Sequence, residues 1–220
     1  MHASAPYPLF IYLEGARVVV VGAGAVAERK IATLLEYGAA VTVVAPEATE
    51  SMRALVEQGR IEWLQRPYRE GDLEGAILAI GATSDESVNA RVHAEASSRN
   101  QLVNVVDVPP LCNCIVPSIM RRGRLQVAVS TAGAAPSVAR EMRHDLEQRY
   151  PAYWETYVDV LADVRVLVKE RVPGPASVRT PLFEAVSAAG IEKRIAAGEE
   201  VDAESLYREI VAPLLEGEGL

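Results

Sequence analysis

The chain has 220 residues, of which half are hydrophobic, so it can bury one large core, or one core and a smaller appendage. It carries 22 lysines and arginines against 30 aspartates and glutamates, and the net charge of −8 argues against a protein that binds nucleic acid. No apolar run is long enough to cross a bilayer, and no signal-peptide pattern precedes the first expected strand. We therefore expect a cytoplasmic protein with no membrane partner.

A run of four valines, residues 18–21, is followed directly by Gly22, Ala23 and Gly24 and then by a helical pattern. Four consecutive valines predict a strand that is buried on both faces, as in a parallel sheet. The spacing Gly22-x-Gly24-x-x-Ala27 permits a tight turn, a pyrophosphate close to the backbone, and a helix packed closely on its strand. We predict a dinucleotide site; the alternative is a tight strand–helix turn without a ligand. The residues expected to contact the dinucleotide are Gly22, Ala23, Gly24, Ala25, Val26, Pro46, Glu47 and Thr83.

The second expected strand, residues 41–45, is followed by Pro46 and Glu47. Dinucleotide-binding folds usually place an acidic residue at the end of this strand, where it holds the ribose hydroxyls. Glu47 is the nearest carboxylate, and no arginine or lysine stands at this strand end to meet a 2′-phosphate. NAD is therefore favoured over NADP. The alternative is that Glu47 only caps or solubilises the next helix.

The chain then alternates between strand and helix patterns. We expect a helix over residues 51–59, strands over 61–64 and 76–83, a helix over 85–99 and a strand over 102–107. The strand over 76–83 ends in small residues, which allow a ligand to approach the sheet edge closely. This alternation predicts a doubly wound α/β sheet, which is a Rossmann domain.

The pattern changes after residue 107. Two strand-like stretches flank a basic glycine turn at 121–124 and predict a hairpin, which a helix beginning near Pro136 follows. Helical stripes then cover 158–172, 182–197 and 204–215. We predict three parts: a Rossmann domain (1–112), a central hairpin-plus-helix dimerisation segment (113–149) and a helical C-terminal domain (150–220).

Several motifs carry a family resemblance over about residues 7–150. They are residues 7–10, 21–30, 41–46, 82–85, 88–89, 103–107, 116–118 and 129–137. Together they resemble the siroheme-synthase-type precorrin-2 dehydrogenase and sirohydrochlorin ferrochelatase family. The resemblance implies oxidation of precorrin-2 to sirohydrochlorin with NAD as the hydride acceptor, a homodimer interlocked through the central segment, and, in some members, ferrous iron insertion. Because the chain ends at residue 220, we expect the stand-alone form without a methyltransferase module.

Asp107 is the candidate catalytic residue, because it ends a predicted strand and the family's essential aspartate falls on it. Removing hydride from a tetrapyrrole also requires removal of a proton, and a carboxylate base suits that step. The alternative is a turn cap before Pro109. Asp107 and His144 are also candidate iron ligands, although the sequence holds no firm metal-binding set.

The implied tetrapyrrole carries eight carboxylates, which an acidic protein binds only through local cations. Arg121, Arg140 and Arg143 are the candidates, because guanidinium groups bind carboxylates bidentately. The alternative is a solvated surface that balances nearby acids. Ser130, Thr131 and Gly133 precede the next helix and are expected to receive a carboxylate or simply to cap that helix.

Cys112 and Cys114 lack the paired spacing of a zinc motif, so we interpret them as packed thiols. Two other functions stay open at this point. One is a chelatase that keeps the nucleotide only structurally, and the other is a nucleotide-sensing regulatory domain. An open, cation-lined surface beyond Asp107 would favour an enzyme.

Overall fold

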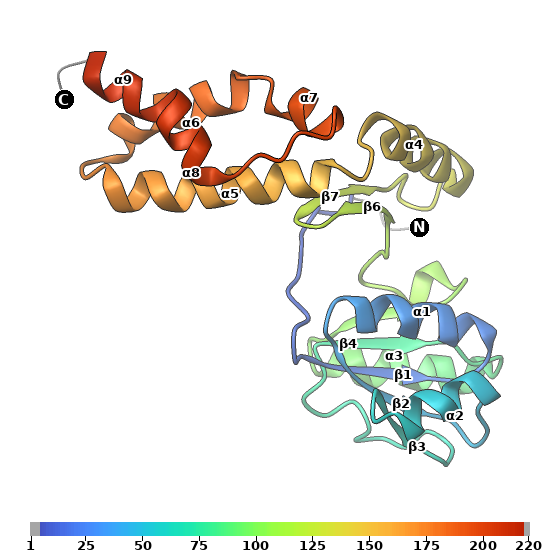
Figure 1. Ribbon diagram of the computed structural model, residues 1–220. Coiled ribbons are helices and arrows are strands. Elements are labelled where there is room, and N and C mark those ends of the chain that lie inside the picture. The colour runs from blue at the N-terminus through green and yellow to red at the C-terminus, as the bar shows by residue number, and fades with distance from the viewer. Residues whose placement is uncertain (1–4, 218–220) are drawn as a thin grey trace. The chain divides into compact units, whose positions relative to one another are not determined.

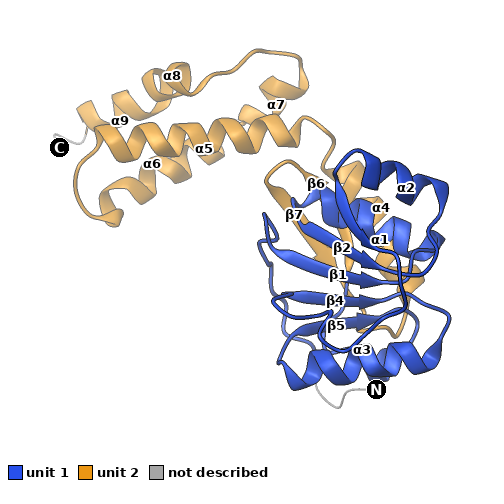
Figure 2. Cartoon of the chain, turned by 90° about the horizontal axis from the view of Figure 1, so that it is seen from below, with its two compact units in different colours: residues 1–116 blue, residues 117–220 orange. Residues whose placement is uncertain are grey.

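The computed structural model describes residues 5–217, which belong to two compact units, residues 1–116 and 117–220 (Figure 2). Each unit encloses its own hydrophobic core. None of the helices in residues 5–217 combines the length and the apolar character that a membrane crossing requires. The predicted division into three parts stays a prediction.

The first unit is built on a five-stranded parallel sheet (Figure 1). Its strands are β1 (Arg17–Val21), β2 (Ala40–Val44), β3 (Ile61–Leu64), β4 (Leu78–Gly81) and β5 (Leu102–Val105). They lie in the order β3-β2-β1-β4-β5. The chain therefore builds outward from β1 on one side and then returns to build outward from β4, which confirms the predicted doubly wound sheet and creates a switch point between β1 and β4.

Helices cover both faces of this sheet. They are α1 (Ala25–Glu36), α2 (Glu50–Glu57) and α3 (Glu86–Ser98). Val18 and Val20 pack in the core cluster that includes residues of α1 and α2, whereas Val19 and Val21 pack in the cluster that includes residues of α3. The valine run is thus buried on both faces, as its composition predicts.

The segment between β3 and β4 forms turns. One ion pair, between Arg66 and Asp72, helps to hold it in place. Arg66 Nη1 donates to Asp72 Oδ2 over 2.8 Å, and Arg66 Nη2 donates to Asp72 Oδ1 over 2.7 Å. The Arg69 backbone N–H also donates to Asp72 Oδ2 over 2.8 Å. These bonds add to the backbone turn bonds of the segment, such as the one from Glu74 N to Gly71 O over 3.0 Å.

The outer edge of β5 is covered by the chain that follows it. After the 3₁₀ turn Pro109–Leu111, the Asn113 backbone N–H donates to Val103 O over 3.0 Å. The Asn113 side chain accepts from Val103 N over 2.7 Å and donates to Gln101 O over 2.8 Å. One residue therefore satisfies three backbone groups of an edge strand.

The second unit begins with an antiparallel hairpin, β6 (Ser118–Arg122) and β7 (Leu125–Val129), which confirms the predicted hairpin. The helices that follow are α4 (Pro136–Arg149), α5 (Trp154–Arg171), α6 (Ala176–Ala188), α7 (Ile191–Ala196), α8 (Ala203–Leu206) and α9 (Ala212–Gly217), with a π-helical segment Tyr207–Val211 between the last two. Buried side chains of α5, α6 and α7 meet in one core. The expectation of one helix over 182–197 is wrong, because Gly190 has a left-handed φ of 68° and separates α6 from α7.

Candidate functional site

The turn between β1 and α1 packs tightly between two neighbouring strands. The Gly22 N–H donates to Val44 O at the end of β2 over 3.0 Å, and the Ala82 N–H donates to Val21 O over 2.8 Å. Gly22 has a φ of 112°, and a Cβ built there would lie 2.4 Å from the Ala82 carbonyl oxygen. Only glycine fits this position, so the first glycine serves the turn itself.

Gly24 has a different surrounding. It is the N-cap residue of α1, with no side-chain hydrogen bond to the cap, and a Cβ built on it meets nothing within 4 Å. Open space therefore adjoins the first N–H groups of a twelve-residue helix, where a phosphate fits both sterically and electrostatically. Ala25 is exposed beside it, whereas the Ala23 side chain is buried, so Ala23 can offer a ligand only its backbone.

The loop between β2 and α2 holds the predicted ribose contacts. Pro46 and Glu47 are exposed there. Sequence reasoning missed Glu28 of α1, whose Oε1 accepts hydrogen bonds from the Thr49 and Ser51 hydroxyls. The bonds from Ser51 and Thr49 hold the pKa of Glu28 below its usual range. The pairing depends on the β1–α1 and β2–α2 crossovers, so no local signal identifies it.

Thr83 follows β4 and is half-buried. Its Oγ1 accepts from the Asp85 N–H over 3.1 Å, and its carbonyl accepts from Asn89 Nδ2 over 2.9 Å. Asn89 is 5% exposed. It belongs to the family motif at residues 88–89, but sequence reasoning assigned it no role. A Cβ at Gly81 would lie 2.8 Å from Asn89 Oδ1, so the glycine makes room for this amide. These contacts fix the Thr83 loop against the first turn of α3.

Asp107 is exposed and follows β5 at the same sheet edge as the ends of β1 and β4. It is one of three non-glycine residues in the described chain with positive φ, at 59°. Aspartate and asparagine adopt this left-handed conformation more readily than other non-glycine residues, because their short polar side chains can bond the local backbone. Bonds on both sides hold the turn, from Val106 N to Gly81 O over 2.9 Å and from Val108 N to Val105 O over 3.3 Å.

The loop before α4 belongs to the second unit. Ser130 Oγ accepts from the Ala132 N–H over 3.1 Å, and Thr131 Oγ1 accepts from the Ala135 N–H over 3.0 Å. Ala132 has a φ of 52°, and a Cβ on Gly133 would meet nothing within 4 Å. The two hydroxyls organise the loop up to the N-cap residue Ala135, which has no side chain able to accept a hydrogen bond from the first turn of α4.

Several of the arginines have partners within the second unit. Arg143 pairs with Glu147, Arg122 Nε donates to Tyr150 O over 2.9 Å, and Arg124 pairs with Asp159 over 3.0 Å. Arg121 Nε donates to Gly123 O over 3.3 Å. Arg140 is exposed on α4. These contacts make the arginines part of the hairpin's own structure as well as candidates for carboxylate binding.

The candidate metal ligands do not form a set. His144 Nδ1 lies 3.3 Å from Glu147 Oε2, and in residues 5–217 no group of three or more histidine, cysteine, aspartate or glutamate side chains could hold a metal ion. Cys112 and Cys114 form no disulfide, and their thiols pack against opposite faces of the sheet. Burial raises the pKa of both, to about 11 for Cys114, so neither is a reactive thiolate.

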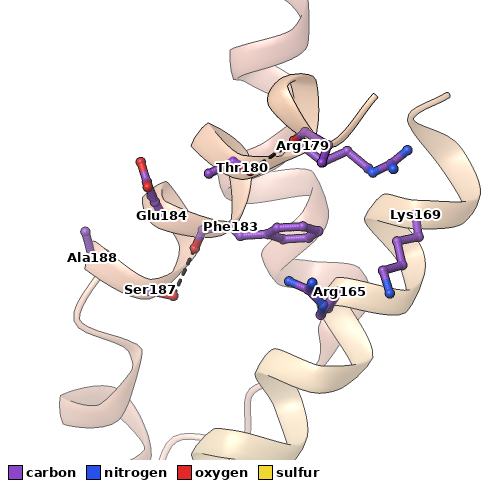
Figure 3. A pocket seen from close by; sticks show the side chains of 9 residues that line it. Arg165, Lys169, Arg179, Thr180, Phe183, Glu184, Ser187 and Ala188 are labelled. Carbon is purple, nitrogen blue, oxygen red and sulfur yellow. Dashed lines mark hydrogen bonds between the residues drawn. The ribbon is translucent and has the colours of Figure 1, made fainter. Parts of the chain in front are cut away.

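The second unit also has a cavity of about 680 Å³ between α5 and α6 (Figure 3). Arg165, Lys169 and Arg179 line it, and the Arg165 guanidinium carbon lies 4.5 Å from the centre of the Phe183 ring. Glu184 contributes the opposite charge. The helical stripes of the sequence did not reveal this cavity, because its lining residues come from two separate helices.

A parallel sheet with an open glycine turn at its switch point defines the first unit as a dinucleotide-binding Rossmann domain. A family model for NAD(P)-binding domains matches residues 9–118, and a model for the central part of sirohaem biosynthesis proteins matches residues 122–149. The chain belongs to this NAD(P)-binding family of sirohaem biosynthesis proteins, as the sequence motifs indicate.

Individual relatives and one solved structure are also similar to this chain. The siroheme synthases of Pseudomonas aeruginosa and Azotobacter vinelandii are 42% and 41% identical over 205 and 199 residues. These alignments cover 93% and 90% of this chain, but the chain spans less than half of the relatives' length, at 44% and 43%. The solved structure of SirC, a precorrin-2 dehydrogenase, matches with a TM-score of 0.76 at 29% identity and covers 93% of this chain and 98% of its own.

Proposed function

We propose that this protein oxidises precorrin-2 to sirohydrochlorin with NAD as the hydride acceptor. The observation that carries the proposal is Asp107, an exposed carboxylate in a left-handed turn at the cofactor edge of the Rossmann sheet. The likeness to SirC over nearly the whole of both chains supports the same reaction. NAD, when bound, supplies the acceptor for a hydride.

The residues around the glycine turn have binding roles in this proposal. Backbone N–H groups from Gly24 onward hold the pyrophosphate, because no side chain blocks their approach. The Asn89 amide holds the Thr83 carbonyl and so fixes the loop after β4 to α3, while the Ala82 N–H donates to Val21 O and joins that loop to the end of β1. The β5 end, with Asp107, lies one strand further from β1 than β4, on the side of the switch point opposite β2.

The oxidation removes two hydrogens from the substrate. One leaves with both bonding electrons as the hydride, and the other leaves as a proton. Asp107 accepts that proton, because its carboxylate is exposed and its turn is held by backbone bonds on both sides. The arginines near the hairpin and the Ser130–Gly133 loop are proposed to receive substrate carboxylates.

Anaerobic turnover of precorrin-2 with NAD tests this function, with NADH and sirohydrochlorin followed by absorbance. Asp107→Asn keeps a residue that tolerates a left-handed backbone. We expect it to bind NAD normally and to lose about 100-fold or more in kcat. Full turnover by this variant removes Asp107 from the mechanism. Binding of NAD by the unaltered protein without turnover favours a nucleotide sensor instead. Addition of ferrous iron to the same reaction, against a protein-free control, tests iron insertion.

We also propose that the protein is a homodimer. Among the described strands β6 and β7 pair only with each other, so each has an outer edge whose backbone groups could pair with a strand of a second chain. Val138 and Met142 on the neighbouring α4 are 43% and 49% exposed. Sedimentation equilibrium should give twice the chain mass, and a monomer at micromolar concentration contradicts the proposal.

A cytoplasmic location is proposed as well. Neither cysteine forms a disulfide, as in proteins of a reducing compartment, and the proposed cofactor is an intracellular nucleotide. Cell fractionation with an antibody to the chain tests this location, and recovery outside the cytoplasmic fraction contradicts it.

A further inference from the structure

The loop of residues 45–49 lies where a dinucleotide-binding fold places the adenosine ribose. It leaves the end of β2, whose Val44 carbonyl accepts from the Gly22 N–H over 3.0 Å. Trp63 Nε1 donates to Ala45 O over 2.9 Å and anchors the start of the loop. A ribose 2′-substituent therefore faces this loop and the helix that follows it.

The beginning of α2 contains the groups of a phosphate site. It offers the hydroxyls of Thr49 and Ser51 and the first N–H groups of an eight-residue helix. Arg53 adds a guanidinium, whose Nε donates to Ala48 O over 3.2 Å. No arginine or lysine stands at the strand end itself, as the sequence indicates, but α2 brings Arg53 back to the following loop. By composition alone this end of α2 would suit the 2′-phosphate of NADP.

An anion of the protein already occupies these groups. Glu28, in the first turn of α1, accepts hydrogen bonds from both hydroxyls through Oε1. The same bonds keep the pKa of Glu28 below its usual range, so the carboxylate is charged at neutral pH. A dianionic phosphate in this place would lose the two hydroxyl donors and meet a negative charge at short range.

We infer that the Glu28 carboxylate selects NAD over NADP by occupying the hydroxyl donors at the start of α2. The inference rests on the proposed cofactor site and adds the residue that sets its specificity. Glu28 acts as a barrier to the 2′-phosphate, whereas NAD carries only a hydroxyl at that position. Arg53 and the two hydroxyls become an acceptor for the phosphate only when Glu28 is removed.

The experiment is calorimetric titration of the full chain with NAD and, separately, NADP at low ionic strength. The unaltered protein should bind NAD at least tenfold more tightly than NADP. In Glu28→Ala we expect NADP to bind about tenfold more tightly than before, while the Kd for NAD changes by less than about threefold. Glu28→Gln keeps the shape without the charge and should shift the preference in the same direction; it also serves if the alanine variant does not fold.

Two further variants make the test specific. Glu50→Gln removes a carboxylate from the same helix end without touching the hydroxyls, so the preference should stay within about twofold. In the double variant Glu28→Ala with Arg53→Ala, the gain in NADP binding should disappear. An unchanged preference in both Glu28 variants, or an equal shift in Glu50→Gln, overturns the inference while leaving the cofactor site intact. Failure of the unaltered protein to bind either nucleotide overturns the cofactor site itself.

Discussion

At the scale of single residues, the two glycines of the turn perform different tasks. Gly22 is required by the fold, because its φ is 112° and the Ala82 carbonyl fills the space of a Cβ. Gly24 is surrounded by open space and has a φ of −88°, which any residue adopts. The motif is a single pattern in the sequence, but only the structure separates its structural part from its ligand-facing part.

Matched substitutions test this separation. We expect Gly22→Ala to lower the free energy of unfolding by about 2–4 kcal/mol, because a steric clash adds to backbone strain. The free energy of unfolding of Gly24→Ala should lie within about 0.5 kcal/mol of that of the unaltered protein. This variant should bind NAD more weakly, because its added methyl group enters the space proposed for the phosphates. Urea unfolding and NAD titration measure the two effects. Equal stability of both variants would refute the assignment.

At the scale of elements, the Asp72 carboxylate helps to hold the turn segment between β3 and β4. Burial raises the pKa of its carboxyl, but hydrogen bonds from Arg66 and from the Arg69 backbone outweigh burial and hold the pKa below its usual range. A carboxyl with a lowered pKa in the folded state stabilises the fold above its unfolded pKa. That stabilisation is lost as the pH falls through the folded value.

The lowered pKa of Asp72 predicts how the stability of the variant Asp72→Asn changes with pH. At pH 7 the variant should be less stable by about 1–3 kcal/mol, because the Arg66 guanidinium loses its charged partner. The difference between the two proteins should narrow as the pH falls below about 4. Thermal unfolding over a pH series measures it. A difference that stays constant down to pH 2 would show that the ion contact contributes nothing.

The elements of the first unit were predictable because their signals are local. The valine run, the glycine spacing and the alternating apolar stretches each predict a strand or a helix, and together they predict a doubly wound sheet. The prediction of one long helix over residues 182–197 was wrong, because the left-handed Gly190 interrupts an otherwise continuous helical pattern. A glycine inside a helical stripe is tolerated or terminates the helix according to tertiary packing, which the pattern does not contain.

The residues of the candidate site at the strand ends were predictable from the sequence, whereas the side-chain hydrogen bonds that join different elements were not. The glycine turn, Thr83 and Asp107 follow strands of one sheet, so their common edge follows from the fold class. The bonds of Glu28 to Thr49 and Ser51 join two crossovers, and the bond of Asn89 to Thr83 joins a helix to a strand end. Side-chain pairs of this kind depend on the packed structure and have no sequence period.

At the scale of the whole molecule, the proposed cofactor contacts all belong to residues 1–116, which have their own cores. We expect this unit, produced alone, to fold and to bind NAD with a Kd within about threefold of the full chain. It should not oxidise precorrin-2, because the proposed substrate cations belong to residues 117–220. Circular dichroism and NAD titration of the fragment measure this, and an unfolded fragment would contradict the independence of the unit.

The edge of β5 has a consequence for the protein in the crowded cell. An open edge strand is a template on which strands of other chains stack and aggregate. Here the Asn113 side chain and backbone make the three bonds that an intruding strand would otherwise make with Gln101 and Val103. Asn113 thus prevents a further strand from pairing with this edge of the sheet. Replacement of Asn113 by alanine would remove the two side-chain bonds, keep the backbone bond to Val103 O, and so make the chain more prone to self-association through the edge of β5.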